Sequence, residues 1–194
     1  MRQIILDVET KKIFDEVGGY FPDRLGVSFV GICLRDSTAG VGEMRGFFED
    51  DLPDLFPLLE QADVVIGFNI DGFDMQTLVP YYKGDISLIP TLDLLDRIKK
   101  SAGHRISLDA VAQATLGIGK SGDGLDAVKY YNSGNYDALK KYCLQDVAVT
   151  RDVYDYGKTK GAVKFRNKWN RMIDCPVDFS FTPKKQVGLQ MSLL

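Results

Sequence analysis

The sequence has few of the residues that would indicate a zinc site, a disulfide framework or a membrane span. Its three cysteines are far apart and form no Cys-x-x-Cys pair, which favours a reducing, cytoplasmic location. It has one histidine and no apolar run near the roughly 20 residues that span a bilayer. The first residues read as a strand rather than a signal peptide. We therefore expect a cytoplasmic protein with no membrane partner.

The chain has 194 residues and 45% hydrophobic content, which fits one domain with a core of its own. We expect that domain at residues 1–181, followed by a tail at 182–194. The net charge of −3 alone argues against binding to nucleic acid. However, residues 158–171 contain six Lys or Arg and no acid, and residues 97–105 contain four. Each basic run is either a solvated face or a contact for phosphates.

Hydrophobic patterns predict hairpin strands first and then strands alternating with helices, which is typical of an α/β fold with a mixed sheet. The expected strands are residues 3–8, 27–34, 44–48, 64–68 and 91–95. The expected helices are 52–59, 73–82, 107–116 and 136–156. Residues 118–135 show no clear period and predict a loop, and residues 162–181 predict a terminal hairpin.

Four acidic residues and a tyrosine occur at structurally informative places in three separate segments. Asp7 and Glu9 are two apart on a strand, so they point to the same face. Asp74 begins a helix after a buried strand, which is a usual position for a site residue in an α/β sheet. Tyr142 and Asp146 are four apart on a helix and share one face. The three segments therefore predict one cluster of carboxylates.

Such a cluster suits the hydrolysis of a phosphodiester. Two hard cations about 3.5–4 Å apart activate water and stabilise the charge on the phosphate, and they prefer oxygen ligands. The sequence thus predicts two divalent ions, Mg²⁺ or Mn²⁺. Each residue also has an ordinary explanation: Asp74 could cap a helix, and Tyr142 could belong to the core. Those explanations do not predict all three segments in this order.

The three segments resemble the motifs of a known family. Residues 7–10 (DVET), 69–74 (NIDGFD) and 142–146 (YCLQD) are similar to the motifs of the DEDD group of 3′–5′ exonucleases, which have a ribonuclease H-like fold. The match is to the tyrosine-bearing branch, which includes proofreading domains of family A and family B DNA polymerases. The second motif has the form typical of family B. The resemblance covers roughly residues 1–157.

This resemblance implies a role for each member of the cluster. Asp7 would bridge both metal ions, and Glu9 and Asp146 would complete the site for the nucleophilic water. Asp74 would reach the second ion, and Tyr142 would orient the attacking water.

The resemblance also implies residues around the terminal nucleotide. Thr10, Asn69 and Phe73 would bind it or support the ligands. Lys141 stands where the other branch of the family has its histidine, so we expect His104 to be a surface or phosphate-contact residue.

The function expected from this resemblance is metal-dependent 3′–5′ exonuclease activity on single-stranded ends, with DNA favoured over RNA, in replication or repair. The products would be nucleoside 5′-monophosphates. An exoribonuclease and a weakly active scaffold that binds nucleic acid or a clamp stay open as alternatives. Residues 165–169 could stack on bases, although ordinary packing is the favoured interpretation of Trp169.

The last five residues, Gln190–Leu194 (QMSLL), resemble a short bacterial peptide pattern that binds the sliding clamp. A peptide of this kind places apolar side chains in a preformed groove. The alternative is an apolar tail without a partner.

Overall fold

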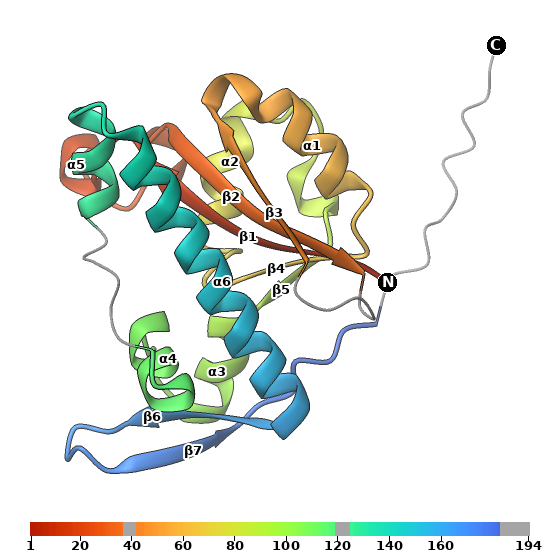
Figure 1. Ribbon diagram of the computed structural model, residues 1–194, viewed down its shortest axis with the longest axis vertical. Helices are drawn as coiled ribbons and strands as arrows, with labels where there is room; N and C mark the ends of the chain where they lie inside the picture. Colours follow the sequence, from red (N-terminus) through yellow and green to blue (C-terminus); the bar gives the residue numbers. More distant parts are fainter. Residues whose placement is uncertain (37–41, 119–124, 183–194) are drawn as a thin grey trace.

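The computed structural model describes residues 1–36, 42–118 and 125–182, and a five-stranded mixed β-sheet lies at its centre (Figure 1). The strand order is β3-β2-β1-β4-β5. The pairs β1–β2 and β2–β3 are antiparallel, whereas β1–β4 and β4–β5 are parallel. The strands are β1 (Arg2–Thr10), β2 (Val27–Asp36), β3 (Glu43–Phe48), β4 (Val64–Gly67) and β5 (Thr91–Asp93). The predicted α/β class with a mixed sheet is confirmed.

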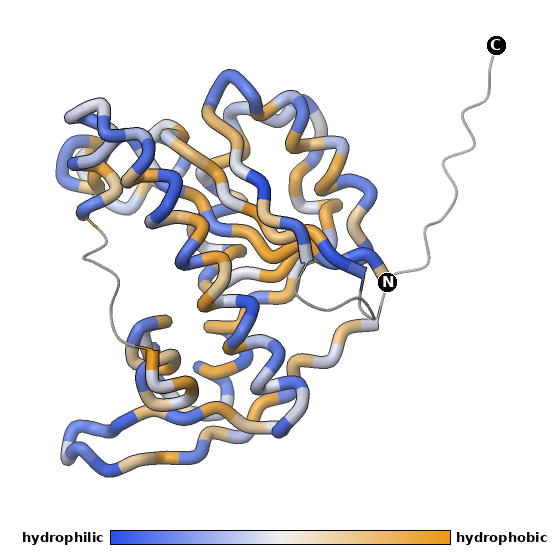
Figure 2. Tube along the Cα trace, viewed as in Figure 1, coloured by the Kyte–Doolittle hydropathy of each residue, from blue (hydrophilic) through white to orange (hydrophobic). Residues whose placement is uncertain are grey.

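Helices cover both faces of this sheet, and its apolar strands lie at the centre of the molecule (Figure 2). Residues of α1 and α2 pack on one face, and residues of α3, α4 and α6 pack on the other. The α-helices are α1 (Leu52–Glu60), α2 (Asp74–Leu78), α3 (Leu94–Ala102), α4 (Leu108–Leu116), α5 (Asp126–Asn132) and α6 (Tyr136–Lys160). The 3₁₀ helices are η1 (Phe14–Val17), η2 (Pro22–Arg24), η3 (Glu49–Asp51), η4 (Val79–Tyr81) and η5 (Ile86–Leu88).

The alternation of side chains between the two faces of the sheet along β1 decides where Asp7 and Glu9 point. Ile4, Leu6 and Val8 are buried among residues of α1 and α2. Ile5 is buried on the other face, in the core that includes residues of α6. Because successive strand residues alternate, Asp7 and Glu9 also belong to the α6 face.

Helix α6 approaches the sheet closely where β2 has no side chain. A Cβ added at Gly31 would lie 2.9 Å from Cys143 Sγ and 3.0 Å from Val147 Cγ2. Gly31 pairs with Asp7 across the β1–β2 ladder. The glycine therefore lets α6 lie directly over the strand that carries the first acidic motif.

The structure corrects one predicted segment and confirms another. Residues 118–135 were expected to form a loop, but α5 occupies residues 126–132 of this range, and residues 119–124 lie outside the described part. The sequence of α5 shows no clear hydrophobic period because the helix is short and Ala127 is its one buried residue. Helix α5 contacts α6 and β1. The helix expected after Ser107 is confirmed, and the Ser107 Oγ accepts a hydrogen bond from the Ala110 N–H at 3.2 Å.

The predicted terminal hairpin is confirmed as β6 (Ala162–Arg166) and β7 (Met172–Pro176), which lies beside α3 and α4 (Figure 1). The expectation that Trp169 packs in the protein is wrong, because 69% of its surface is exposed. Asn167 Oδ1 accepts hydrogen bonds from the backbone of Trp169 and Arg171, each at 3.0 Å. This turn carries Trp169 past the ends of both strands.

Two other expectations concern the cysteines and the chain's last residues. Cys33, Cys143 and Cys175 are all buried thiols. Within the described ranges, no helix combines the length and the apolar character that crossing a membrane requires. Residues Gln190–Leu194 lie outside those ranges, so the sliding-clamp peptide stays a prediction.

Candidate active site

The first and third acidic motifs meet where β1 lies under α6. Asp7, Glu9 and Cys143 each offer a ligand atom, and these three atoms lie within 4.8 Å of one another. The Cys143 thiol donates to the backbone oxygen and to Oδ2 of Asp7, both at 3.5 Å. Strand alternation supplies the two carboxylates, and the helix supplies the thiol next to Tyr142.

All four predicted carboxylates interact through their charges. Burial, and then the charge of Asp146, raises the pKa of Asp7 to about 7, and the hydrogen bond from Cys143 opposes this. Burial raises the pKa of Glu9 well above its ordinary value, followed by the charges of Asp7, Asp146 and Asp74. The cluster therefore repels its own negative charge.

Asp74 reaches the cluster from the opposite direction, at the first residue of α2. It is 3% exposed, and its Oδ1 accepts a hydrogen bond from the backbone N–H of Val8 at 2.9 Å. Burial and the nearby Asp7 raise its pKa, and the hydrogen bond from Val8 lowers it. Asp74 is thus attached to the strand between the two acidic residues of the first motif.

Tyr142 lies on the same side of α6 as Asp146. Burial raises its pKa, and the charges of Asp146, Glu9 and Asp7 raise it further. The phenol therefore keeps its proton at neutral pH and is able to donate a hydrogen bond. Its ring makes an edge contact with Tyr130 of α5 at 6.4 Å between centroids.

The second motif forms a tight turn around Asn69, whose φ of 69° is left-handed. Asparagine adopts this conformation more readily than most residues. Asp93, at the end of β5, accepts the backbone N–H groups of Asn69 at 3.0 Å and Asp71 at 3.3 Å. The Asn69 side chain accepts a hydrogen bond from Arg105 Nη1 at 3.3 Å.

The predicted nucleotide-binding residues lie in two places. Thr10 and Phe73 both line a cavity of about 310 Å³ beside the end of β1. Most of its other walls are apolar and come from residues such as Ile13, Leu25 and Val128. Asn69 is not among its lining residues and instead contacts Arg105.

Sequence reasoning missed two residues of this site. Cys143 touches Asp7, and the buried helical spacing of Leu139, Cys143 and Val147 was a signal that could have placed it toward β1. Asp93 holds the turn of the second motif and also caps α3 by accepting the Asp96 N–H at 3.2 Å. An aspartate directly before the apolar first turn of a helix is a recognisable N-cap, so the sequence could have indicated this role of Asp93. Its contacts with the turn around Asn69 are long-range and leave no local pattern.

Residues 4–157 match a family model described as the RNase_H superfamily. The chain belongs to the RNase_H superfamily. The predicted ribonuclease H-like fold is confirmed. A search of curated proteins finds no match.

Solved structures resemble this RNase_H superfamily chain at low identity. The family B DNA polymerase of the hyperthermophilic archaeon Pyrobaculum calidifontis has 19% identity and a TM-score of 0.59. The match covers 81% of this chain and 24% of the polymerase. Exonuclease I, without ligand, has 15% identity and a TM-score of 0.45, with 81% of this chain and 42% of that one covered. The chain thus spans about a quarter of the polymerase's length.

The cluster of this RNase_H superfamily member suits divalent cations. Its donors at Asp7, Glu9, Asp74 and Asp146 are hard carboxylate oxygens, which Mg²⁺ and Mn²⁺ prefer. Burial raises the pKa of the Cys143 thiol well above its ordinary value, so at neutral pH it stays protonated and is a poor ligand. A bound cation would offset the repulsion among the carboxylates.

The burial of Asp7 and its repulsion by Asp146 predict an unusual pH dependence of stability. Because folding raises the pKa of Asp7 from 3.8 to about 7, its contribution is fully present below pH 4 and is lost as the pH rises through 7. In EDTA at pH 8, we expect Asp7→Asn to increase the free energy of unfolding by roughly 1–4 kcal/mol, whereas at pH 4 the two proteins should be similar. Urea denaturation measures both. Parallel pH curves for the two proteins contradict this expectation.

Proposed function

We propose that this chain is a metal-dependent 3′–5′ exonuclease that releases nucleoside 5′-monophosphates from single-stranded ends, DNA in preference to RNA. One observation carries the proposal: carboxylates from three distant segments interact in one cluster beside a protonated tyrosine. Acidic residues repel one another, and a cluster of carboxylates with strongly raised pKa values is typical of sites that hold a cation or carry out a reaction. The family of the chain and the motif resemblance support the same activity.

The chain's own residues have distinct tasks in this reaction. Two divalent cations held by Asp7, Glu9, Asp74 and Asp146 would supply an activated water and relieve the charge of the phosphate. The protonated phenol of Tyr142 donates a hydrogen bond that orients the water toward the phosphorus atom. The water oxygen forms a bond to phosphorus as the bond from phosphorus to the 3′ oxygen of the preceding nucleotide breaks, and this oxygen takes up the proton that the water loses.

The cavity beside β1 is a suitable place for the terminal nucleoside. Thr10 directly follows Glu9, and Phe73 directly precedes Asp74, so this cavity adjoins the carboxylates. Its mostly apolar walls fit the faces of a base and a sugar. Arg105, which binds Asn69, presents a cation next to the second motif for a phosphate.

The β6–β7 hairpin extends this proposal to the upstream part of the strand. Its tip exposes Trp169, and Lys168 Nζ lies 4.5 Å from the centre of that ring. The hairpin contacts the basic run at residues 97–105. The ring of His104 lies edge-on to the ring of Phe165, with 5.7 Å between their centroids. An exposed aromatic ring among cations is the arrangement that binds single strands through stacking and phosphate contacts.

The catalytic proposal predicts a defined product pattern. With 5′-labelled single-stranded DNA and Mg²⁺ or Mn²⁺, we expect a ladder that shortens from the 3′ end and is absent in EDTA. Asp146→Asn should lower the rate by roughly 10²–10³-fold, because it removes a ligand worth several kcal/mol in the transition state. Gel electrophoresis of the products measures both.

Asp137→Asn is the matched control, since it makes the same change on the same helix at an exposed residue. It should keep full activity. A ladder on RNA alone would favour an exoribonuclease, and binding without a ladder would favour a scaffold. Full activity of the Asp146→Asn protein would overturn the site.

Tyr142→Phe tests the proposed role of the phenol. The change keeps the ring and its contact with Tyr130 but removes the donor, so we expect kcat to fall roughly 10–10²-fold with little change in KM. Single-turnover kinetics on a short oligonucleotide measure the effect. An unchanged kcat means that Tyr142 serves only to pack the helix.

Trp169→Ala tests the hairpin. Stacking of one base is worth about 1–3 kcal/mol, so we expect the Kd for a 20-nucleotide single strand to rise at least roughly 5-fold. A dinucleotide, which lacks the upstream nucleotides proposed to stack on Trp169, should be cleaved normally. Leu88→Ala removes another exposed apolar side chain and should change neither. Equal effects on both substrates, or none, contradict the proposed path.

A further inference from the structure

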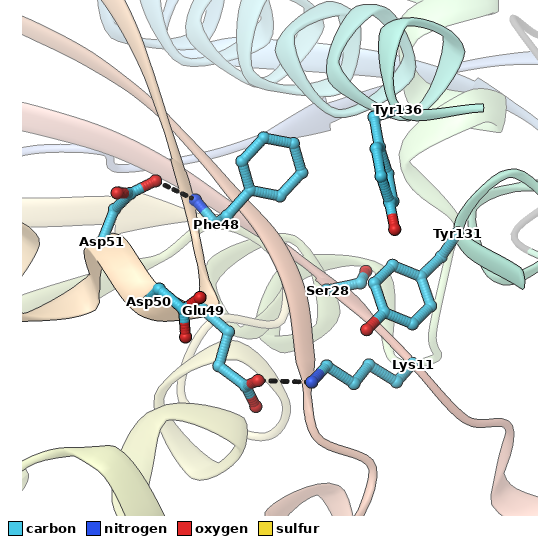
Figure 3. Close-up of a pocket in the computed structure, with 8 residues that line it drawn as sticks. All are labelled: Lys11, Ser28, Phe48, Glu49, Asp50, Asp51, Tyr131 and Tyr136. Atoms are coloured by element: carbon cyan, nitrogen blue, oxygen red, sulfur yellow. Dashed lines mark hydrogen bonds and ion pairs between the residues drawn. The ribbon is translucent and has the colours of Figure 1, made fainter. Parts of the chain in front are cut away.

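A second cavity of about 360 Å³ lies on the other side of the end of β1, between β2, β3 and the helices α5 and α6 (Figure 3). Its walls combine three aromatic rings, three carboxylates, one lysine and a serine. None of the predicted catalytic residues lines it. Its size is within the range of small-ligand sites.

Ser28 gives this cavity an unsatisfied polar atom. The residue is 1% exposed, and its Oγ has no hydrogen-bond partner among the described residues. Figure 3 shows Ser28 beside the rings of Tyr131 and Tyr136, facing the space that they enclose. A buried hydroxyl without a partner is destabilising, so it marks a position where a donor from outside would be favourable.

The aromatic rings of the cavity already contact cations. Lys11 Nζ lies 5.6 Å from the centre of the Tyr131 ring, and Lys140 Nζ lies 5.1 Å from that of Phe48. Tyr136 contacts both rings, at 5.5 Å from Phe48 and 6.1 Å from Tyr131. The faces of such rings attract positive charge.

The charge of the lining argues against a phosphate. Lys11 is ion-paired with Glu49. Asp50 and Asp51 form no ion pair with another described residue, although Asp51 Oδ2 accepts a hydrogen bond from the Phe48 N–H at 3.0 Å, and both are exposed at the edge of the cavity. The cavity therefore favours a cation and is unsuited to a continuation of a nucleic-acid strand.

We propose that this cavity binds the guanidinium group of an arginine side chain from a partner protein. A guanidinium is flat, stacks on aromatic rings and carries five N–H donors in a fixed geometry. It could donate to Ser28 Oγ and to Asp50 while its face lies on Tyr136 or Phe48. The proposal does not depend on nuclease activity.

Titration of the isotope-labelled full chain with Nα-acetyl-arginine methylamide tests the proposal. We expect saturable NMR shifts at the rings of Tyr131 and Tyr136. The citrulline analogue has the same shape without the charge and should bind at least roughly 10-fold more weakly, because it loses the charge-assisted contacts. Equal binding of the two probes, or tighter binding of deoxyadenosine in the same cavity, overturns the proposal.

Two variants locate the contacts. Asp50→Asn should weaken binding of the arginine probe about 2- to 5-fold, which is the effect expected from the loss of one exposed ion pair. Asp54→Asn, an equal change at an exposed residue of α1 outside the cavity, should leave it unchanged. Equal effects of the two variants contradict a specific site.

Ser28→Ala separates a binding role from a structural one. Loss of a hydroxyl that has no partner should raise the melting temperature of the free protein by about 2–4 °C. The same change should weaken binding of the arginine probe. Nuclease activity on short DNA should not change. A lower melting temperature, or undiminished probe binding, rules out Ser28 as the acceptor.

Discussion

The desolvation and mutual repulsion of four clustered carboxylates are the constraint on which the rest of this structure depends. The shift of the Asp7 pKa from 3.8 to about 7 corresponds to roughly 4 kcal/mol. The core has to outweigh this cost. Ile4, Ile5, Leu6 and Val8 of the same strand are at most 3% exposed and contribute roughly 6–12 kcal/mol by burial. Strand β1 therefore tolerates its charges because its apolar residues are almost fully buried.

Specific contacts hold the acidic segments at one place despite this repulsion. Gly31 allows α6 to approach the sheet, and the N–H of Val8 binds Asp74. Asp93 fixes the turn around Asn69 by accepting two of its backbone N–H groups. Each contact joins residues far apart in the chain, so the site forms only when the whole sheet has assembled. Its geometry is a property of the fold rather than of the motifs.

This dependence explains what the sequence could predict. The two-residue spacing of Asp7 and Glu9 and the four-residue spacing of Tyr142 and Asp146 are local, so period alone places each pair on one face. The central sheet and the terminal hairpin could also be predicted, because their hydrophobic patterns are local. Asp93, the helix α5 and the exposure of Trp169 depend on tertiary contacts or on a turn, which leave no repeating signal. The roles of the site residues rest on the family resemblance.

The end of β1 separates two cavities of different chemistry. Thr10 and Lys12 line the apolar cavity, whereas Lys11 lines the acidic one. Helix α5 also contributes to both cavities, because Val128 lines the apolar one and Tyr131 lines the acidic one. Successive residues of an extended chain point to opposite sides, so three residues after Glu9 serve both cavities. A ligand that fixes Lys11 and Tyr131 would therefore restrain the segments that carry Thr10 and Val128, which form walls of the proposed nucleotide cavity.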